Sequence, residues 1–448
     1  MLSPPQDKVR ELQRTLYRTA KADPARRFHA LYDKVYRSDV IERAWQQVRA
    51  NRGAAGIDQV TLAEVEQYGI ARLLDELAIS LRQGSWRPQA ARRVWIPKPG
   101  SDEKRPLSIP TVADRIVQTA VKIVIEPIFE ADFTPASFGF RPKRSAHDAL
   151  QVLLDEAWDG RRWVVETDIA SCFEAIPHEG LMEAIEERIC DQPLLKLLRA
   201  MLRAGGMEHG TVHHPVTGTP QGGVISPLLA NVYLHRLDRR WQAEGRGRLV
   251  RYADDLVVMC ATEQNANQAL ELLTALLGDL GLAPKTAKTR IVHLREGGEG
   301  LDFLGFHHRT VRGNTPRSRH LVFLARWPSR KAMQHARDRI RAITARSRLR
   351  VDPEELVGDL NAFLRGWTGY FRYGNSAHAF LHIHDYAVQR LALWVAKRHK
   401  RPRAYGWARV VHLSPNHMGL LTLDGHVVAP RPHRDWRETP KAAGERRR

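Results

Sequence analysis

The chain has 448 residues, 43% of them hydrophobic and 27% charged, which is typical of a globular protein of two or three domains. Its 70 Lys and Arg residues outnumber 50 Asp and Glu, and the formal net charge of +20 predicts a polyanionic partner. The widely spaced Cys172, Cys190 and Cys260 argue against a disulfide framework, and no run approaches the roughly 18 apolar residues of a membrane span, so we expect a cytoplasmic protein with no membrane partner.

The N-terminal part of the chain has a helical pattern. Apolar residues recur at helical spacing from residue 8 to about 50, and Leu12, Leu16 and Tyr17 are predicted to share one face. The same spacing returns from Leu62 to Leu81. We therefore predict a helical N-terminal extension over residues 1–50.

Strand and helix patterns then alternate. Residues 85–110 alternate in polarity and are interrupted at Pro99-Gly100, which predicts a two-stranded hairpin with mostly basic exposed positions. Residues 112–129 and 133–158 each predict a helix, the second one after a turn. A Val-rich strand is predicted within 161–173.

The middle of the chain continues this alternation. The stretch from Leu181 to Leu202 predicts helix, and a glycine-rich turn leads into another helix with Ser226 as N-cap and Pro227 at its first position. The apolar face predicted for this helix consists of Leu228, Leu229, Val232, Tyr233 and Leu237.

The rest of the chain divides near Ser318. A hairpin around Asp254-Asp255, a helix over 265–280 and a strand over 299–310 complete a predicted mixed α/β region. From residue 327 to about 405 the pattern is helical and basic, and the last forty or so residues show little pattern. The expected fold class is α/β, followed by an all-helical domain.

Two adjacent acids, Asp254 and Asp255, lie between the apolar runs of "RLVRYADDLVVMC". Neighbouring strand residues point to opposite faces, so both acids can serve one site only beside a tight turn. A solvated turn is the alternative, because Asp is a favoured turn residue. A further acid, Asp168, lies at the end of another Val-rich strand, and its presence favours a metal site over a solvated turn. Mg²⁺ prefers oxygen ligands, and two such ions about 4 Å apart would support nucleotidyl transfer.

Six motifs together carry a resemblance to a family. They are, in chain order, "NRGAAGID", "IPKPGSDEKRPLSIPTVADRIVQ", "SFGFRPKRSAHDAL", "ETDIASCF", "GTPQGGVISPLLANVYLH" and "YADD". This ordered set, over about residues 50–310, resembles a group II intron reverse transcriptase and maturase. The resemblance implies a right-hand polymerase with fingers and palm over 51–317 and a helical thumb, domain X, over 318–408.

The resemblance implies roles for the acids. Asp168 and Asp254 would be the principal metal ligands, with Asp255 supporting and Ile169 also at the metal site. The cofactor would be two Mg²⁺ ions, with Mn²⁺ as the alternative. Tyr252 and Ala253 would shape the hairpin near the primer end.

Four further residues would bind the incoming nucleotide. Phe173 matches the position of an aromatic ring that favours deoxynucleotides, although a core phenylalanine is the alternative. Lys98 and Arg105, on the predicted hairpin, would neutralise charge on the triphosphate, although a solvated basic face is the alternative. Gln221 would lie near template and nucleotide, in a loop that also serves as a helix-entry turn.

Further residues would bind nucleic acid. Arg141 would contact template phosphate, with a structural salt bridge as the alternative. Lys288 would lie near the primer end, in a register that Ala283 and Ala287 leave uncertain because the family has more polar residues there.

The helical C-terminal region is predicted to bind RNA. The stretch "LNAFLRGWTGYFRYGN" resembles the domain X signature, and Trp367 and Phe371, four residues apart, are predicted to be core. Cationic residues would then contact RNA, with a solvated helix face as the alternative. The candidates are Arg330, Lys331, Arg337, Arg341, Arg365, Arg372, Lys397, Arg398 and Lys400.

Residues 409–448 are predicted to form a short basic tail without an endonuclease domain, because no cysteine follows Cys260. The predicted function is an RNA-directed DNA polymerase that binds its group II intron RNA and assists splicing and retrohoming in a bacterial cytoplasm or nucleoid. Its partners would be that RNA, an RNA template with DNA primer, dNTPs and target DNA. The alternatives are a splicing-only RNA-binding maturase and a domesticated reverse transcriptase of repair or phage defence.

Overall fold

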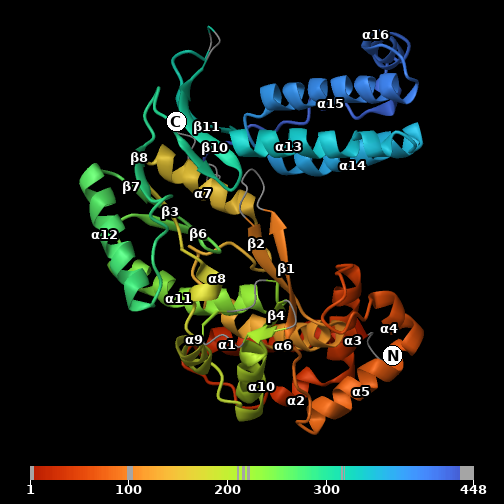
Figure 1. Ribbon diagram of the computed structural model, residues 1–448. Coiled ribbons are helices and arrows are strands. Elements are labelled where there is room, and N and C mark those ends of the chain that lie inside the picture. Colours follow the sequence, from red (N-terminus) through yellow and green to blue (C-terminus); the bar gives the residue numbers. More distant parts are fainter. Residues whose placement is uncertain are drawn as a thin grey trace, which may run out of the picture. The chain divides into compact units, whose positions relative to one another are not determined.

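A computed structural model describes residues 5–97, 104–208, 211–213, 217–218, 222–313, 316 and 318–433. The chain divides into two compact units (Figure 1). Unit 1 comprises Met1–Lys98, Asp102–Ala146 and Val165–Arg290, and unit 2 comprises Pro99–Ser101, His147–Val164 and Ile291–Arg448. Within the described part of the chain, no helix has the length and apolar composition needed to cross a membrane.

The predicted N-terminal helices are present in unit 1. They are α1 (Pro5–Ala22), α2 (Tyr32–Val35), α3 (Ser38–Ala50), α4 (Leu62–Tyr68) and α5 (Ile70–Arg82). The buried face of α1 includes Val9, Leu16 and Ala20, whereas Tyr17 is 40% exposed, so its predicted place on that face is wrong. Gly69, with φ +106°, divides the continuous helix predicted between residues 62 and 81 into α4 and α5.

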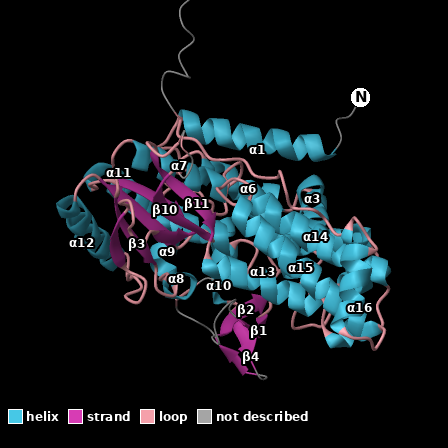
Figure 2. Cartoon of the chain, turned by 90° about the horizontal axis from the view of Figure 1, so that it is seen from above, coloured by secondary structure: helices cyan, strands magenta, loops and turns pink. Residues whose placement is uncertain are grey.

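Helix α6 (Val112–Glu130) is the central helix of unit 1, and both α1 and α3 pack against it. It is buried around most of its circumference, as expected for a helix rich in Ile and Val. The predicted hairpin is present as β1 (Ala91–Pro97) and β2 (Lys104–Ile109), which pair antiparallel. With β4 (Gly206–Glu208) and β5 (Thr211–His213) they form a sheet of order β2-β1-β4-β5, and Figure 2 shows β1, β2 and β4 side by side.

A second sheet carries the predicted acids, and we call it the palm sheet. Its order is β6-β7-β3-β8, formed by β6 (Arg248–Tyr252), β7 (Asp255–Cys260), β3 (Trp163–Asp168) and β8 (Arg290–His293). The run from Leu256 to Cys260 is buried at every position, as in a central strand covered on both faces, and α12 (Glu263–Asp279) packs against β7.

Four more helices complete unit 1: α8 (Cys172–Ala175), α9 (His178–Glu186), α10 (Gln192–Arg203) and α11 (Ser226–Glu244). The predicted apolar face of α11 is buried, as are Asn231 and Asp238 on the same helix. The predicted N-cap is wrong by one residue. Ile225 already has helical dihedral angles and occupies the cap position, so Ser226 is the first helical residue.

Unit 2 combines helices with a three-stranded sheet of order β11-β10-β9. The strands are β9 (Leu301–Phe303), β10 (Phe306–Arg312) and β11 (Val322–Pro328), and the helices are α7 (Ala146–Trp158), α13 (Arg330–Ile343), α14 (Pro353–Phe371), α15 (Ala377–Arg398) and α16 (Arg403–Trp407). Figures 1 and 2 show α13, α14 and α15 side by side. Strand β11 was not predicted from the sequence, and the predicted helix that included Trp327 and Pro328 is wrong there. Helix α13 begins after Ser329, which caps it by accepting from the Ala332 N–H.

Candidate polymerase active site

The Asp254-Asp255 pair lies at a tight hairpin turn, as predicted. Tyr252 of β6 pairs with Asp255 of β7, so only Ala253 and Asp254 connect the strands. Ala253 has φ +57°, the left-handed conformation that such short connections require. Gly139 packs against this turn so closely that a Cβ on it would lie 2.5 Å from the Ala253 backbone nitrogen.

The end of β3 lies beside this turn. The Ile169 N–H donates to the Asp254 carbonyl at 3.0 Å, which joins the chain after Asp168 to the YADD turn. Ile169 is buried, and only its backbone carbonyl can serve as an oxygen ligand. The structure therefore brings together the three acids predicted from separate parts of the sequence.

Residues 283–288 cover the other side of β3. The Ala170 N–H donates to the Ala283 carbonyl at 2.9 Å, and the Lys285 N–H donates to the Asp168 carbonyl at 2.7 Å. This pairing fixes the register that the sequence left uncertain, and the Lys288 ammonium donates to Asp168 Oδ2. Lys288 therefore belongs to the acid cluster itself.

Burial and mutual repulsion control the protonation of the cluster. Burial, followed by the hydrogen bond to Asp168 and the charges of Asp168 and Asp254, raises the pKa of Asp255 from 3.8 to about 8. Burial, together with the Asp168 charge, also raises the pKa of Asp254. Partial burial acts to lower the pKa of Lys288, but its hydrogen bond to Asp168 and the surrounding carboxylates outweigh this, so its pKa is raised.

The donor set suits a hard divalent cation. Carboxylate oxygens are the ligands that Mg²⁺ prefers, and the raised pKa of Asp255 shows that added positive charge would stabilise the ionised cluster. Among the described residues, no three His, Cys, Asp or Glu side chains already form a metal-binding group. A cation bound to Asp168 and Asp254 would compete with the Lys288 ammonium for Asp168.

Phe173 follows Asp168 by five residues, and the backbone around it is closely packed and conformationally restricted. Ser171 has φ +44°, and the short helix α8 that contains Phe173 begins directly after it. Gly218 approaches this segment closely, because a Cβ there would lie 3.0 Å from the Phe173 carbonyl oxygen. Phe173 is half-buried, so its ring is not part of the fully buried core.

The glycine loop also approaches β2. A Cβ on Gly222, which has φ +108°, would lie 2.4 Å from the Ser108 carbonyl oxygen. The neighbouring Gln221 and Lys98 both lie outside the described residues, so their predicted roles stay predictions. Arg105 is described, and it is exposed on β2 opposite Ile96.

Arg141 has a structural environment. Its side chain is 3% exposed and forms a two-pronged ion pair with Glu130, at 3.0 and 2.8 Å. Its remaining Nη1 donates to the Thr134 and Ser137 carbonyls, both at 2.7 Å. The guanidinium therefore serves the fold, as in the alternative stated for this residue, and the structure gives no support to a template contact.

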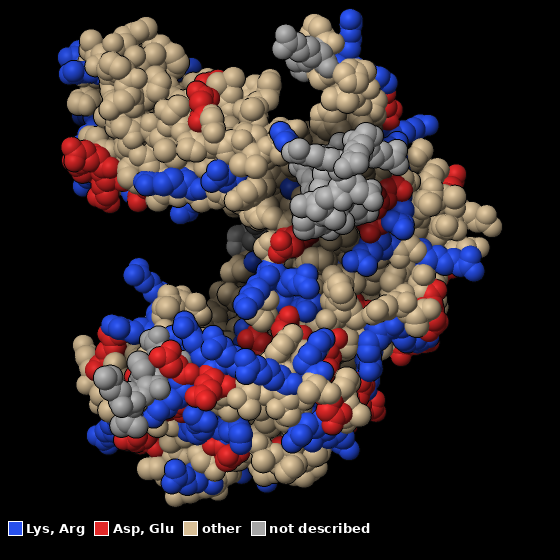
Figure 3. All heavy atoms as spheres, turned by 180° about the vertical axis from the view of Figure 1, so that it is seen from behind, with Lys and Arg blue, Asp and Glu red and all other residues tan. Residues whose placement is uncertain are grey.

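Unit 2 contains the remaining cationic candidates. Arg330, Lys331, Arg341 and Arg365 are exposed, whereas Arg337 and Arg372 are half-buried. Arg398 donates to the Leu349 and Val351 carbonyls, so it stabilises the helices. Trp367 and Phe371 are 7% and 6% exposed, which confirms them as core residues. Figure 3 shows one face of the molecule, where Lys and Arg side chains are widespread among Asp and Glu.

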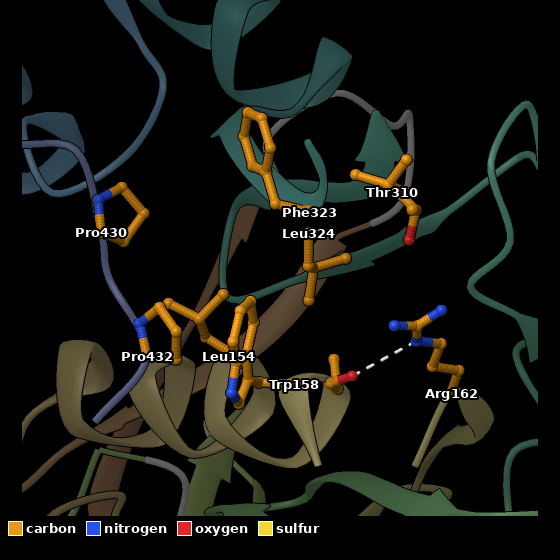
Figure 4. A pocket seen from close by; sticks show the side chains of 10 residues that line it. Leu154, Trp158, Arg162, Thr310, Phe323, Leu324, Pro430 and Pro432 are labelled. Carbon is orange, nitrogen blue, oxygen red and sulfur yellow. Dashed lines mark hydrogen bonds between the residues drawn. The ribbon is translucent and has the colours of Figure 1, made fainter. Parts of the chain in front are cut away.

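An apolar pocket in unit 2 contains none of the predicted site residues (Figure 4). Leu154 and Trp158 of α7, Phe323 and Leu324 of β11, and the later Pro430 and Pro432 line it. Arg162 at its edge donates to the Ala157 carbonyl at 3.3 Å.

Two parts of the chain match known protein families. Residues 96–308 match the family described as "Reverse transcriptase (RNA-dependent DNA polymerase)", and residues 333–411 match "Group II intron, maturase-specific domain". The chain is 35% identical over 347 residues to Protein YkfC of Escherichia coli, covering 68% of this chain and 88% of that protein.

Two relatives have informative names. The group II intron-encoded protein LtrA of Lactococcus lactis is 41% identical over 214 residues, which cover 47% of this chain and 35% of LtrA. The nuclear intron maturase 4, mitochondrial, of Arabidopsis thaliana is 31% identical over 145 residues, which cover 31% of this chain and 17% of that protein. The similarity to both therefore spans well under half of each relative.

Proposed function

Since the chain belongs to the family of group II intron-encoded reverse transcriptases and maturases, we propose that it synthesises DNA on an RNA template at the Asp168/Asp254/Asp255 cluster. The observation that carries the proposal is the convergence of the three acids. The Ile169–Asp254 backbone bond joins the end of β3 to the YADD turn, and burial combined with like charge leaves the cluster short of positive charge.

The reaction would join the primer 3′-oxygen to the α-phosphorus of a dNTP and break the bond to the pyrophosphate leaving group. Asp168 and Asp254 would hold two divalent ions, with Asp255 and the Ile169 carbonyl supporting. Such ions, when bound, activate the hydroxyl and stabilise the leaving oxygen. Lys288, already beside Asp168, would retain a positive charge near the reacting groups.

The other predicted residues would select and orient the nucleotide. Arg105, exposed on β2, would contact the triphosphate together with Lys98, and Gln221 would lie near template and nucleotide. Phe173 would place its ring under the sugar and exclude a 2′-hydroxyl. The close approach of Gly218 to the Phe173 backbone supports this role, because it restricts the movement of the ring's attachment point.

We further propose that unit 2 binds group II intron RNA and that the chain assists splicing and retrohoming. The exposed Arg330, Lys331 and Arg365 would contact phosphates, and so would Arg341 on leaving its ion pair with Asp338 at 3.1 Å. The maturase-specific match to residues 333–411 supports this assignment, and the expected thumb bounds of 318–408 are retained as part of the proposal.

The test of the polymerase is primer extension by the purified chain on poly(rA) with oligo(dT), dTTP and Mg²⁺. The wild type should extend the primer, whereas Asp254→Asn should reduce extension by at least about a thousandfold, because it removes one charge from a metal ligand without changing its size. Filter binding of a structured group II intron transcript should be equal for both proteins. A wild type that binds the transcript tightly but does not extend would favour the splicing-only alternative.

A further inference from the structure

Arg251 directly precedes the YADD turn and is the most deeply buried arginine among the described residues, at 0% exposure. Its position on β6 places a full positive charge directly after the buried Leu249 and Val250. Burial of a guanidinium destabilises the folded state by on the order of several kcal/mol, as for other buried ions, unless the group is paired and hydrogen-bonded. The partners of Arg251 therefore indicate its role.

Helix α11 supplies the partners that hold the guanidinium. Asp238 accepts from Nε at 2.8 Å and from Nη2 at 2.5 Å, and it is itself 1% exposed. Asn231, seven residues earlier on the same helix, accepts from Nη1 at 2.9 Å. Ser137 Oγ accepts from Nη2 at 2.9 Å. These contacts satisfy the charge without involving the turn.

One further contact reaches the turn itself. Nη1 of Arg251 donates to the Ala253 carbonyl at 3.1 Å, and Ala253 is the residue with the left-handed backbone conformation. That conformation is unfavourable for any residue with a Cβ and persists only where the surroundings impose it. Asn231 reinforces the arrangement because its Nδ2 donates to the carbonyl of Gly139, the glycine packed against Ala253.

We propose that Arg251 is a positioning residue for DNA synthesis, acting through the Ala253 carbonyl to hold Asp254 in register with Asp168. The inference rests on the proposed function, because the distance between these two carboxylates matters only where both bind the same cations. Asp238 and Asn231 orient the guanidinium, so α11 serves as the rigid support of the YADD turn. Lysine cannot replace arginine, because an ammonium lacks the planar set of donors that reaches all four partners.

Arg251→Lys is the test, and Arg188→Lys is the matched control. Arg188 lies in the same unit, is 5% exposed, pairs with Asp132 at 3.1 Å and donates to the Ala20 carbonyl at 2.9 Å, so the control removes the same kind of buried network without touching the turn. Melting curves measure the stability that each variant loses. Asn231→Ala is a second variant that preserves the Arg251–Asp238 pair.

Two readouts distinguish positioning from stability. In primer extension, Arg251→Lys should lower kcat at least about tenfold and raise the Mg²⁺ concentration for half-maximal rate several-fold, with the KM for dTTP changed less than about twofold. In a titration with Mn²⁺ followed by electron paramagnetic resonance, Arg251→Lys should weaken ion binding several-fold. Asn231→Ala should change the Mg²⁺ requirement and the Mn²⁺ affinity in the same direction as Arg251→Lys. Arg188→Lys should change neither quantity.

Each contrary result has a distinct meaning. Wild-type Mg²⁺ dependence and Mn²⁺ affinity in Arg251→Lys would overturn the inference, as would equal shifts in Arg188→Lys. A wild type that binds Mn²⁺ but does not extend primers would contradict the proposed function alone, and the Mn²⁺ titration would still decide the role of Arg251.

Discussion

At the scale of single residues, the acid cluster is defined by an imbalance of charge. Three carboxylates lie together with the ammonium of Lys288, the charge of Lys285 also acts on Asp254, and partial burial limits how far water can compensate the remaining imbalance. Asp255 responds most strongly, with its pKa raised from 3.8 to about 8. Near neutral pH it therefore holds a proton until a cation enters the site.

This protonation makes stability depend on pH. Between pH 4 and 8 the folded chain binds a proton on Asp255 that the unfolded chain has lost, so its contribution to the free energy of unfolding decreases as pH rises through that range. Asp255→Asn should remove this contribution. We expect a smaller fall in the urea midpoint from pH 5 to pH 8 for the variant than for the wild type.

Both urea series should contain EDTA, and a parallel series at pH 8 should contain Mg²⁺. Mg²⁺ should raise the midpoint of the wild type more than that of Asp255→Asn, because only the wild type has the third carboxylate to ionise. Identical pH profiles for the two proteins would show that Asp255 is ionised throughout the range.

The positions of candidate residues were predictable where the pattern is local, and their roles stay predictions. Asp168, Asp254 and Asp255 stand out because a further strand-end acid, distant in sequence, makes a solvated turn the weaker explanation of the Asp254-Asp255 pair. The sequence could not decide between a salt bridge and a template contact for Arg141, because its ion-pair partner Glu130 lies on a different element. Lys288 was placed near the primer end, but only the pairing of residues 283–285 with β3 brings its ammonium to Asp168.

At the scale of elements, the YADD turn depends on a close backbone contact. Gly139→Ala would put a Cβ 2.5 Å from the Ala253 nitrogen and 3.0 Å from the Tyr252 carbonyl carbon, where only backbone can move. Overpacking of this kind costs about 1–3 kcal/mol. We expect a lower melting temperature and at least about a tenfold loss in primer extension, because the displaced atoms belong to the turn that carries Asp254.

Gly278→Ala is the control for this substitution. Gly278 lies in α12 with no atom within 4 Å of the added Cβ, so the change should leave extension unaltered and stabilise the helix slightly. If Gly139→Ala extended primers at the wild-type rate, the turn would tolerate displacement and its geometry would not limit catalysis.

Elements with a strong period were predictable, and their ends were less so. The helices α3, α7 and α12 and the two hairpins follow from apolar spacing, because burial of one face repeats at the period of the element. Helix α6 follows instead from its richness in Ile and Val, which fits its burial on most sides. Strand β11 was missed because its apolar residues continue almost directly into the pattern of α13, and only the cap formed by Ser329 separates them. Gly69 divides α4 from α5 for a conformational reason that periodicity does not reveal.

At the scale of the whole molecule, the net charge of +20 predicts strong dependence of RNA affinity on salt. If Arg330 and Lys331 contact phosphates, then Arg330→Gln combined with Lys331→Gln should reduce the slope of log affinity against log salt by about 1.4, at about 0.7 per contact. Filter binding of a group II intron transcript at several salt concentrations measures this slope.

A charge-matched control is available in unit 1. Arg239 and Arg240 are paired with Glu187 and Asp279, at 2.9 and 2.6 Å, so replacing both by Gln removes the same charge from residues engaged elsewhere. Equal changes in slope for the two double variants would mean that affinity follows net charge alone and that unit 2 has no special role.

Domain organisation was only partly predictable. A change from mixed patterns to basic helices indicated a boundary near residue 318, but the compact units are formed from separated segments of chain, and α7 belongs almost wholly to unit 2 although it precedes β3. Sequence patterns do not reveal that separated segments form one unit, because they describe only residues that are neighbours along the chain. The expected domain bounds therefore stay predictions.

The contact between Lys288 and Asp168 gives the protein an internal counterion. A site built only from carboxylates would repel itself whenever its metal is depleted, and folding would then depend on the ion. Here the ammonium offsets part of that repulsion from within the chain. The chain can therefore fold before any metal binds, and divalent ions that bind later would add to its stability as well as support the proposed catalysis.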